Sequence, residues 1–94
     1  MSKFYYQILD RETLKPIFEE KFVKDTPLVL ARHVVIDCAA DFYYNRRDYH
    51  IVSFPIIFRL FDSNDNHIAD FDIETVTVLN FNIVSYKKSG EPDE

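Results

Sequence analysis

A single stretch of helical periodicity, residues 28–42, interrupts a chain that otherwise has the composition of strands and turns. Its apolar residues recur at intervals of three and four, so they share one side of a helix. Asp25-Thr26-Pro27 offers a capping side chain followed by proline, and Asn45 tolerates the left-handed conformation that closes helices. We therefore predict one amphipathic helix from residue 28 to residue 44 or 45. Its apolar positions are Leu28, Ala31, Val35, Cys38, Ala39 and Phe42.

Strand-like segments lie on both sides of this helix. Residues 3–9 and 17–23 are rich in aromatic and branched side chains, which favours a hairpin, and residues 51–61 and 68–74 predict a second one. Residues 75–86 either continue the last strand after a bulge or form a fifth strand. The sequence therefore predicts an α+β fold of order β-β-α-β-β, an antiparallel sheet of four or five strands with one helix packed on one face.

Length and hydropathy limit the organisation of the chain. With 94 residues we expect a single domain, residues 1–86, followed by a flexible C-terminal tail, residues 87–94, that contains no apolar residue. The N-terminus lacks the apolar stretch of a secretory signal, and no apolar run approaches the length that crosses a bilayer. Together with a lone cysteine, these features lead us to expect a cytoplasmic protein with no membrane contact.

Composition excludes several classes of function. The one glycine, Gly90, rules out a glycine-rich phosphate loop, and the one cysteine, Cys38, rules out an intrachain disulfide or a multi-thiolate zinc site. Because Cys38 shares the apolar helix face, we expect a buried, inert thiol. The net charge of −5 argues against direct binding of nucleic acid. We predict no enzyme activity, no cofactor and no metal, with a small metal-dependent enzyme using His33 and Asp37 as an alternative.

The segment Asp62-x-Asn64-x-Asn66 resembles the first half of a calcium loop. However, His67 stands where the sharp turn of such a loop needs glycine, and Ile73 stands where a glutamate closes the site. We therefore predict a hairpin turn in which Asn and Asp adopt positive φ.

Two sets of acidic residues are candidates for binding a basic partner. Asp37 and Asp41 are like charges one turn apart in the C-terminal half of the predicted helix, where the helix dipole disfavours anions. Asp70, Asp72 and Glu74 alternate with apolar residues, so they project from one strand face about 7 Å apart, a spacing that resembles a row of phosphates. The alternative interpretation of this row is a solvated face that Arg59 partly neutralises across the hairpin.

A third candidate surface joins tyrosine and arginine after the helix, namely Tyr44, Arg46, Arg47 and Tyr49. Tyr and Arg are the side chains that anchor protein interfaces, and two arginines are too few to hold single-stranded nucleic acid, so we expect a protein contact. Alternatively, Tyr43 and Tyr44 cap the core beneath the helix end. On the sheet face away from the helix, Ile57 and Phe61 predict an apolar patch that would allow a homodimer.

Part of the chain also resembles known sequences. Ala40-Asp41-Phe42-Tyr43-Tyr44 is followed by the aromatic-proline strand Phe54-Pro55-Ile56-Ile57-Phe58-Arg59-Leu60-Phe61-Asp62 and the acidic strand at residues 69–74. Over residues 28–74 this arrangement resembles a group of small acidic proteins of bacteria and phages. Those proteins carry a tryptophan-rich segment where this chain has no tryptophan. The resemblance implies a bacterial or phage origin and carries no activity.

These observations predict a small acidic protein-binding module that is not an enzyme and whose partner has a basic surface. Within this class we expect a phage or mobile-element inhibitor of a host nucleic-acid-binding defence protein, of the anti-CRISPR or anti-restriction type. A bacterial immunity or antitoxin protein is the first alternative. A self-assembling structural subunit is the second.

Overall fold

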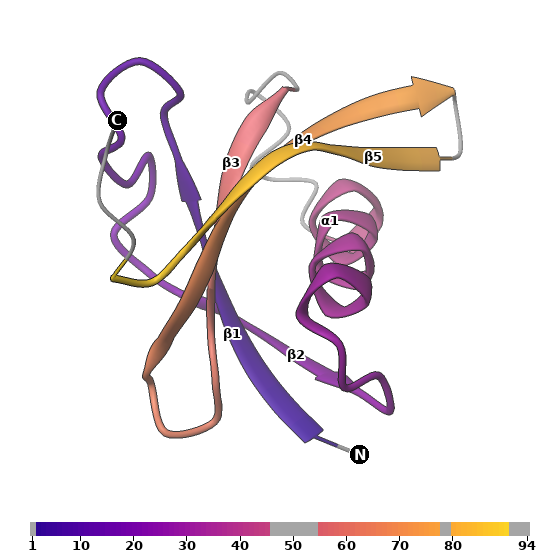
Figure 1. Ribbon diagram of the computed structural model, residues 1–94. Helices are drawn as coiled ribbons and strands as arrows, with labels where there is room; N and C mark the ends of the chain where they lie inside the picture. Colours follow the sequence, from indigo (N-terminus) through magenta and orange to yellow (C-terminus); the bar gives the residue numbers. More distant parts are fainter. Residues whose placement is uncertain (1, 46–54, 78–79, 91–94) are drawn as a thin grey trace.

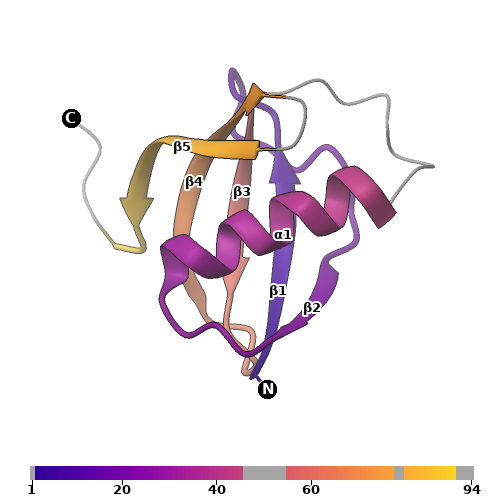
Figure 2. The same cartoon turned by 90° about the vertical axis from the view of Figure 1, so that its right-hand side faces the viewer.

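Five antiparallel strands form one sheet of order β2-β1-β3-β4-β5, and the helix α1 crosses one of its faces (Figures 1 and 2). The structure is a computed structural model that describes residues 2–45, 55–77 and 80–90. The predicted α+β class, with one helix on one face of an antiparallel sheet, is confirmed. The elements are β1 (Ser2–Leu9), β2 (Phe22–Thr26), α1 (Ala31–Asn45), β3 (Ile56–Phe61), β4 (His67–Thr77) and β5 (Asn80–Lys88).

The core lies between α1 and the sheet face that it covers. Alternate residues of the central strands face α1 and are buried, as the period of two predicts. Phe42, near the end of α1, lies at the centre of an aromatic cluster, with its ring 6.0 Å from Phe22, 6.1 Å from Phe58 and 6.4 Å from Phe18. These aromatic contacts hold the C-terminal half of α1 against the strands.

The predicted start of the helix at residue 28 is wrong, because α1 begins at Ala31. Thr26 belongs to β2 and is buried, and its Oγ1 accepts a hydrogen bond from the backbone N–H of Leu28 at 3.2 Å. The same capping chemistry therefore closes a turn instead of opening a helix. Among the described residues no helix has the length and apolar character required to span a bilayer.

The second strand also begins later than the predicted residues 17–23. After β1 the chain folds back in a tight turn, where the carboxylate of Asp10 accepts hydrogen bonds from the backbone of Glu12 and Thr13 and where Leu14 has a φ of 60°. A bridge between Leu9 and Pro16 closes this turn, and β2 starts only at Phe22. In Figure 1 this turn lies beyond the end of β1 and away from α1, whereas farther along the same segment Phe18 packs against the core, with its ring 6.4 Å from that of Phe42.

The C-terminal part of the chain forms a separate fifth strand, which settles the choice left open for residues 75–86. β5 pairs with β4 in an antiparallel ladder whose register shifts between Asp72 and Ile73. The strand extends to Lys88, so the first two residues assigned to the tail belong to the sheet. Beyond it, the N–H of Ser89 donates to the carbonyl of Ile68 at 3.0 Å. The remaining tail residues, 91–94, lie outside the described part of the chain.

Candidate functional site

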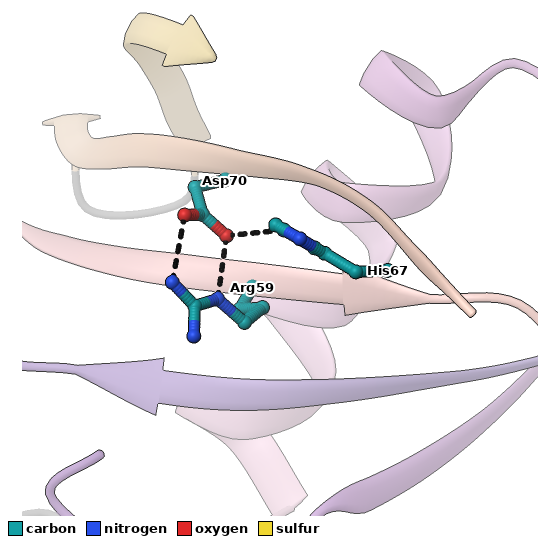
Figure 3. Close-up of polar contacts among 3 residues, drawn as sticks. All are labelled: Arg59, His67 and Asp70. Atoms are coloured by element: carbon teal, nitrogen blue, oxygen red, sulfur yellow. Dashed lines mark hydrogen bonds and ion pairs between the residues drawn. The ribbon is translucent and has the colours of Figure 1, made fainter. Parts of the chain in front are cut away.

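The outer face of the sheet, meaning the face opposite α1, holds the half-buried ion pair between Arg59 and Asp70 that the sequence offered as an alternative interpretation of the acidic row. Arg59 of β3 lies directly across from Asp70 of β4, and its Nε and Nη2 donate to the two carboxylate oxygens at 2.9 and 3.0 Å (Figure 3). His67 Nε2 lies 2.8 Å from the same carboxylate. Burial acts to raise the pKa of Asp70, but the hydrogen bonds from Arg59 and His67 outweigh it and hold that pKa below its usual range.

The second acid of the row is also engaged within the molecule. Asp72 Oδ2 accepts a hydrogen bond from Arg11 Nη2 at 2.7 Å, and Arg11 reaches it from the turn after β1. Asp72 Oδ1 is buried and has no hydrogen-bond partner among the described residues. Glu74, the third acid, is half-buried on the same strand face. The row Asp70, Asp72 and Glu74 is thus brought together as predicted, but its first two carboxylates form ion pairs with arginines.

A hollow of about 300 Å³ lies over this part of the outer face. Its walls combine the carboxylates of Asp70 and Asp72 with the cations of Arg59 and Lys87, so the charges nearly balance. The apolar patch expected beside them is reduced, because Phe61 is only 7% exposed and Lys21 Nζ lies 3.8 Å from the centre of its ring. This face therefore presents neither a row of unpaired anions nor a broad apolar surface.

The helix acids, Asp37 and Asp41, face the sheet. Asp41 Oδ2 accepts the hydroxyl of Tyr6 at 2.5 Å, and its Oδ1 accepts the side-chain amide of Asn45 at 3.0 Å. Asp37 lies 4.0 Å from the ammonium group of Lys24 in β2. Because the buried Tyr6 needs an acceptor for its hydroxyl, Asp41 has a structural role, and its contact with a partner stays a prediction.

Of the predicted tyrosine and arginine corner, the structure describes only the tyrosine of the helix. Tyr44 is exposed, and its ring centroid lies 5.0 Å from that of Tyr43 in an edge-to-face arrangement. Tyr43 in turn lies 5.7 Å from Phe81 of β5, so this pair partly covers the core beneath the helix end. Arg46, Arg47 and Tyr49 lie outside the described residues.

The structure also describes the lone cysteine and the turn that resembles a calcium loop. Cys38 is fully buried, and burial raises its pKa well above the usual range, with the nearby carboxylates of Asp37 and Asp41 adding to the shift. Asp62 forms the predicted turn by accepting the N–H groups of Asn64 and Asn66, which lowers its pKa. Among the described residues, no three His, Cys, Asp or Glu side chains lie close enough together to hold a metal ion.

The sequence did not predict a second depression of the described surface, the α1–β5 groove. This groove, of about 730 Å³, lies between the first turn of α1 and the last residues of β5, over β4. In Figure 2 the end of β5 curves to the side on which α1 begins. The groove is lined by Leu30, Ala31 and Arg32 from the start of α1, by His67, Ile68, Ala69 and Phe71 from β4, and by Tyr86, Lys88 and Ser89 from β5 and its end.

Three consecutive apolar residues, Leu28, Val29 and Leu30, lead into this groove. They are 37%, 78% and 50% exposed, because the helix starts after them instead of burying them. On the opposite wall Tyr86 is 58% exposed and stacks on Phe71, with ring centroids 5.8 Å apart. The available signal was the run Leu28-Val29-Leu30 itself, which exceeds what one face of a helix can bury.

No known protein family, curated protein or solved structure matches this chain.

Proposed function

We propose that this chain is a protein-binding module without catalytic activity, and that it contacts its partner through the α1–β5 groove and the apolar residues beside it. The observation that carries this proposal is the exposure of Leu28, Val29 and Leu30 next to an apolar groove. Neighbouring apolar residues left in water are unfavourable, and on folded proteins such patches mark interaction sites. A tyrosine with its ring half in water, as at Tyr86, is typical of residues that anchor interfaces.

The acidic residues support a partner contact less directly. Asp70, Asp72 and Asp41 each accept a hydrogen bond from a side chain of the same molecule, which accounts for their presence without a partner. The contact with a basic partner through these acids, Asp37 and Glu74 therefore stays a prediction, whereas the groove has no comparable structural role.

Within the class of binding modules we propose an inhibitor carried by a phage or mobile element, acting in the cytoplasm on a host nucleic-acid-binding defence protein. Its support is the small size, the net charge of −5 and the resemblance described above. A bacterial immunity or antitoxin protein is the alternative. The two differ in the partner they hold, which is a defence protein in one case and a toxin in the other.

Site-specific photocrosslinking tests the proposed contact. A photoreactive amino acid replaces Val29, the most exposed apolar residue beside the groove, and in a control variant it replaces the exposed Glu12 in the turn after β1. We expect cell extract of the source organism to yield one abundant protein adduct from position 29 that position 12 does not give. Identical adducts from both positions, or none from either, would contradict a contact at this surface.

A further inference from the structure

We propose that the α1–β5 groove binds an acidic peptide segment whose apolar side chains enter the groove while its carboxylates meet cations on the two walls. This inference rests on the proposed function and names the chemistry of the partner segment that enters this groove. The floor of the groove is lined by three apolar side chains of β4, Ile68, Ala69 and Phe71, which are partly or fully buried. Such a floor accepts leucine or phenylalanine side chains from a partner, because their burial removes apolar surface from water.

The charge of the groove is opposite to that of the whole molecule. The chain carries a net charge of −5, yet no Asp or Glu is among the described residues that line the groove. Arg32 stands on the helix wall and Lys88 on the strand wall. A groove with cations on both sides and an apolar base is complementary to a segment in which carboxylates flank apolar residues.

The helix wall of the groove is positively charged for two reasons. Arg32 is exposed and forms no ion pair within the described part of the chain, so its charge is available at the rim. The first turn of α1 contains no acidic residue, which leaves the positive end of the helix dipole without a compensating side chain on the same wall.

A peptide fits better than a small anionic amphiphile for a reason of shape. Leu30 lines the groove, and the two residues that precede it in the sequence, Leu28 and Val29, are exposed apolar side chains. A peptide is long enough to contact these residues as well as the groove. β5 is also an edge strand of the sheet, whose outer backbone groups have no neighbouring strand among the described residues. Edge strands of this kind accept an extended peptide as an additional strand.

The test compares two synthetic peptides by nuclear magnetic resonance titration of the labelled protein. In one peptide glutamates flank leucine and phenylalanine, and in the other lysine replaces each glutamate. We expect the acidic peptide alone to shift the backbone signals of Arg32, Phe71 and Tyr86, with an affinity that falls as salt is added. Sodium dodecanoate is the third probe, and binding of this amphiphile without binding of the acidic peptide would overturn the proposal.

A charge reversal then separates this inference from the proposed function. The double variant Arg32→Glu and Lys88→Glu should lose the acidic peptide by at least about tenfold and bind the lysine peptide instead. Lys3→Glu with Lys15→Glu changes the net charge equally at exposed positions away from the groove, and should retain the original preference. If both peptides shift the groove signals equally in every variant, the acidic partner is refuted while a protein contact stands. If the crosslink at position 29 fails as well, both proposals fall.

Discussion

Replacing Asp70 by asparagine tests whether the acidic row stabilises the fold. The carboxylate of Asp70 accepts two hydrogen bonds from Arg59, and its Oδ1 also lies 2.8 Å from His67 Nε2. Hydrogen bonds to charged groups contribute about 1.5–3 kcal/mol, and exposed ion pairs contribute about 0.2–1 kcal/mol. The side chains of Arg59 and Asp70 are 30% and 22% exposed, which places this network between the two cases. We expect Asp70→Asn to lower the free energy of unfolding by about 1–2 kcal/mol.

The pH dependence gives the same prediction a second, independent readout. The pKa of Asp70 is lowered in the folded protein, so its ionised form stabilises the fold fully above the unfolded value of about 3.9. That stabilisation is lost as the pH falls through the lower, folded pKa. The difference in stability between the natural chain and Asp70→Asn should therefore be largest at neutral pH and should shrink below about pH 4.

Urea unfolding followed by circular dichroism measures both effects. Asp25→Asn serves as the matched control, because Asp25 is an exposed strand carboxylate, and its substitution should change stability by less than about 0.5 kcal/mol. Equal midpoints for the natural chain and Asp70→Asn would refute the structural role of the carboxylate. A stability difference that stays constant from neutral to acidic pH would refute the electrostatic part of the reasoning.

Three further outcomes are expected. Phe58→Ala should destabilise the fold by about 3–5 kcal/mol in urea unfolding, since the ring is fully buried and its loss leaves a cavity; a loss below about 1 kcal/mol would contradict this packing. The triple replacement of Asp70, Asp72 and Glu74 by lysine should lower the melting temperature, since it places positive charges beside Arg59 and Arg11, and an unchanged melting curve would refute a stabilising role of the row. Cys38 should react with a thiol reagent only as the chain unfolds in urea, and rapid labelling of the native protein would disprove its burial.

The helix and sheet layers of this fold could be predicted from the sequence because the apolar residues recur with the period of each element. The alternation of Ala69, Phe71 and Ile73 with acids identifies the buried face of β4 whatever the rest of the chain does, and all three residues are buried. The same alternation placed Arg59 opposite the acids, and the register confirms its pairing with Asp70. Signals that repeat along an element survive an error of a few residues in its ends.

The ends of elements depend on single hydrogen bonds, and there the sequence was ambiguous. Thr26 followed by proline caps a helix or closes a turn with the same side-chain oxygen, and only the pairing of Thr26 with Ser2 at the end of the β1–β2 ladder decides between them. The tight turn at Asp10 likewise moved the start of β2 to Phe22. The local pattern of apolar residues therefore predicts neither the start of α1 nor the start of β2.

The late start of α1 links these local decisions to the proposed contact. Had the helix begun at Leu28, Val29 and Leu30 would have belonged to a regular amphipathic element. Because Thr26 ends a strand instead, the helix leaves part of β4 uncovered and three apolar residues in water. In the acidic row, Asp70 is compensated by Arg59 of the neighbouring strand and Asp72 by Arg11 of the turn after β1, whereas the groove follows from tertiary structure. The surface that we propose for the partner contact is therefore one that charge patterning alone does not reveal.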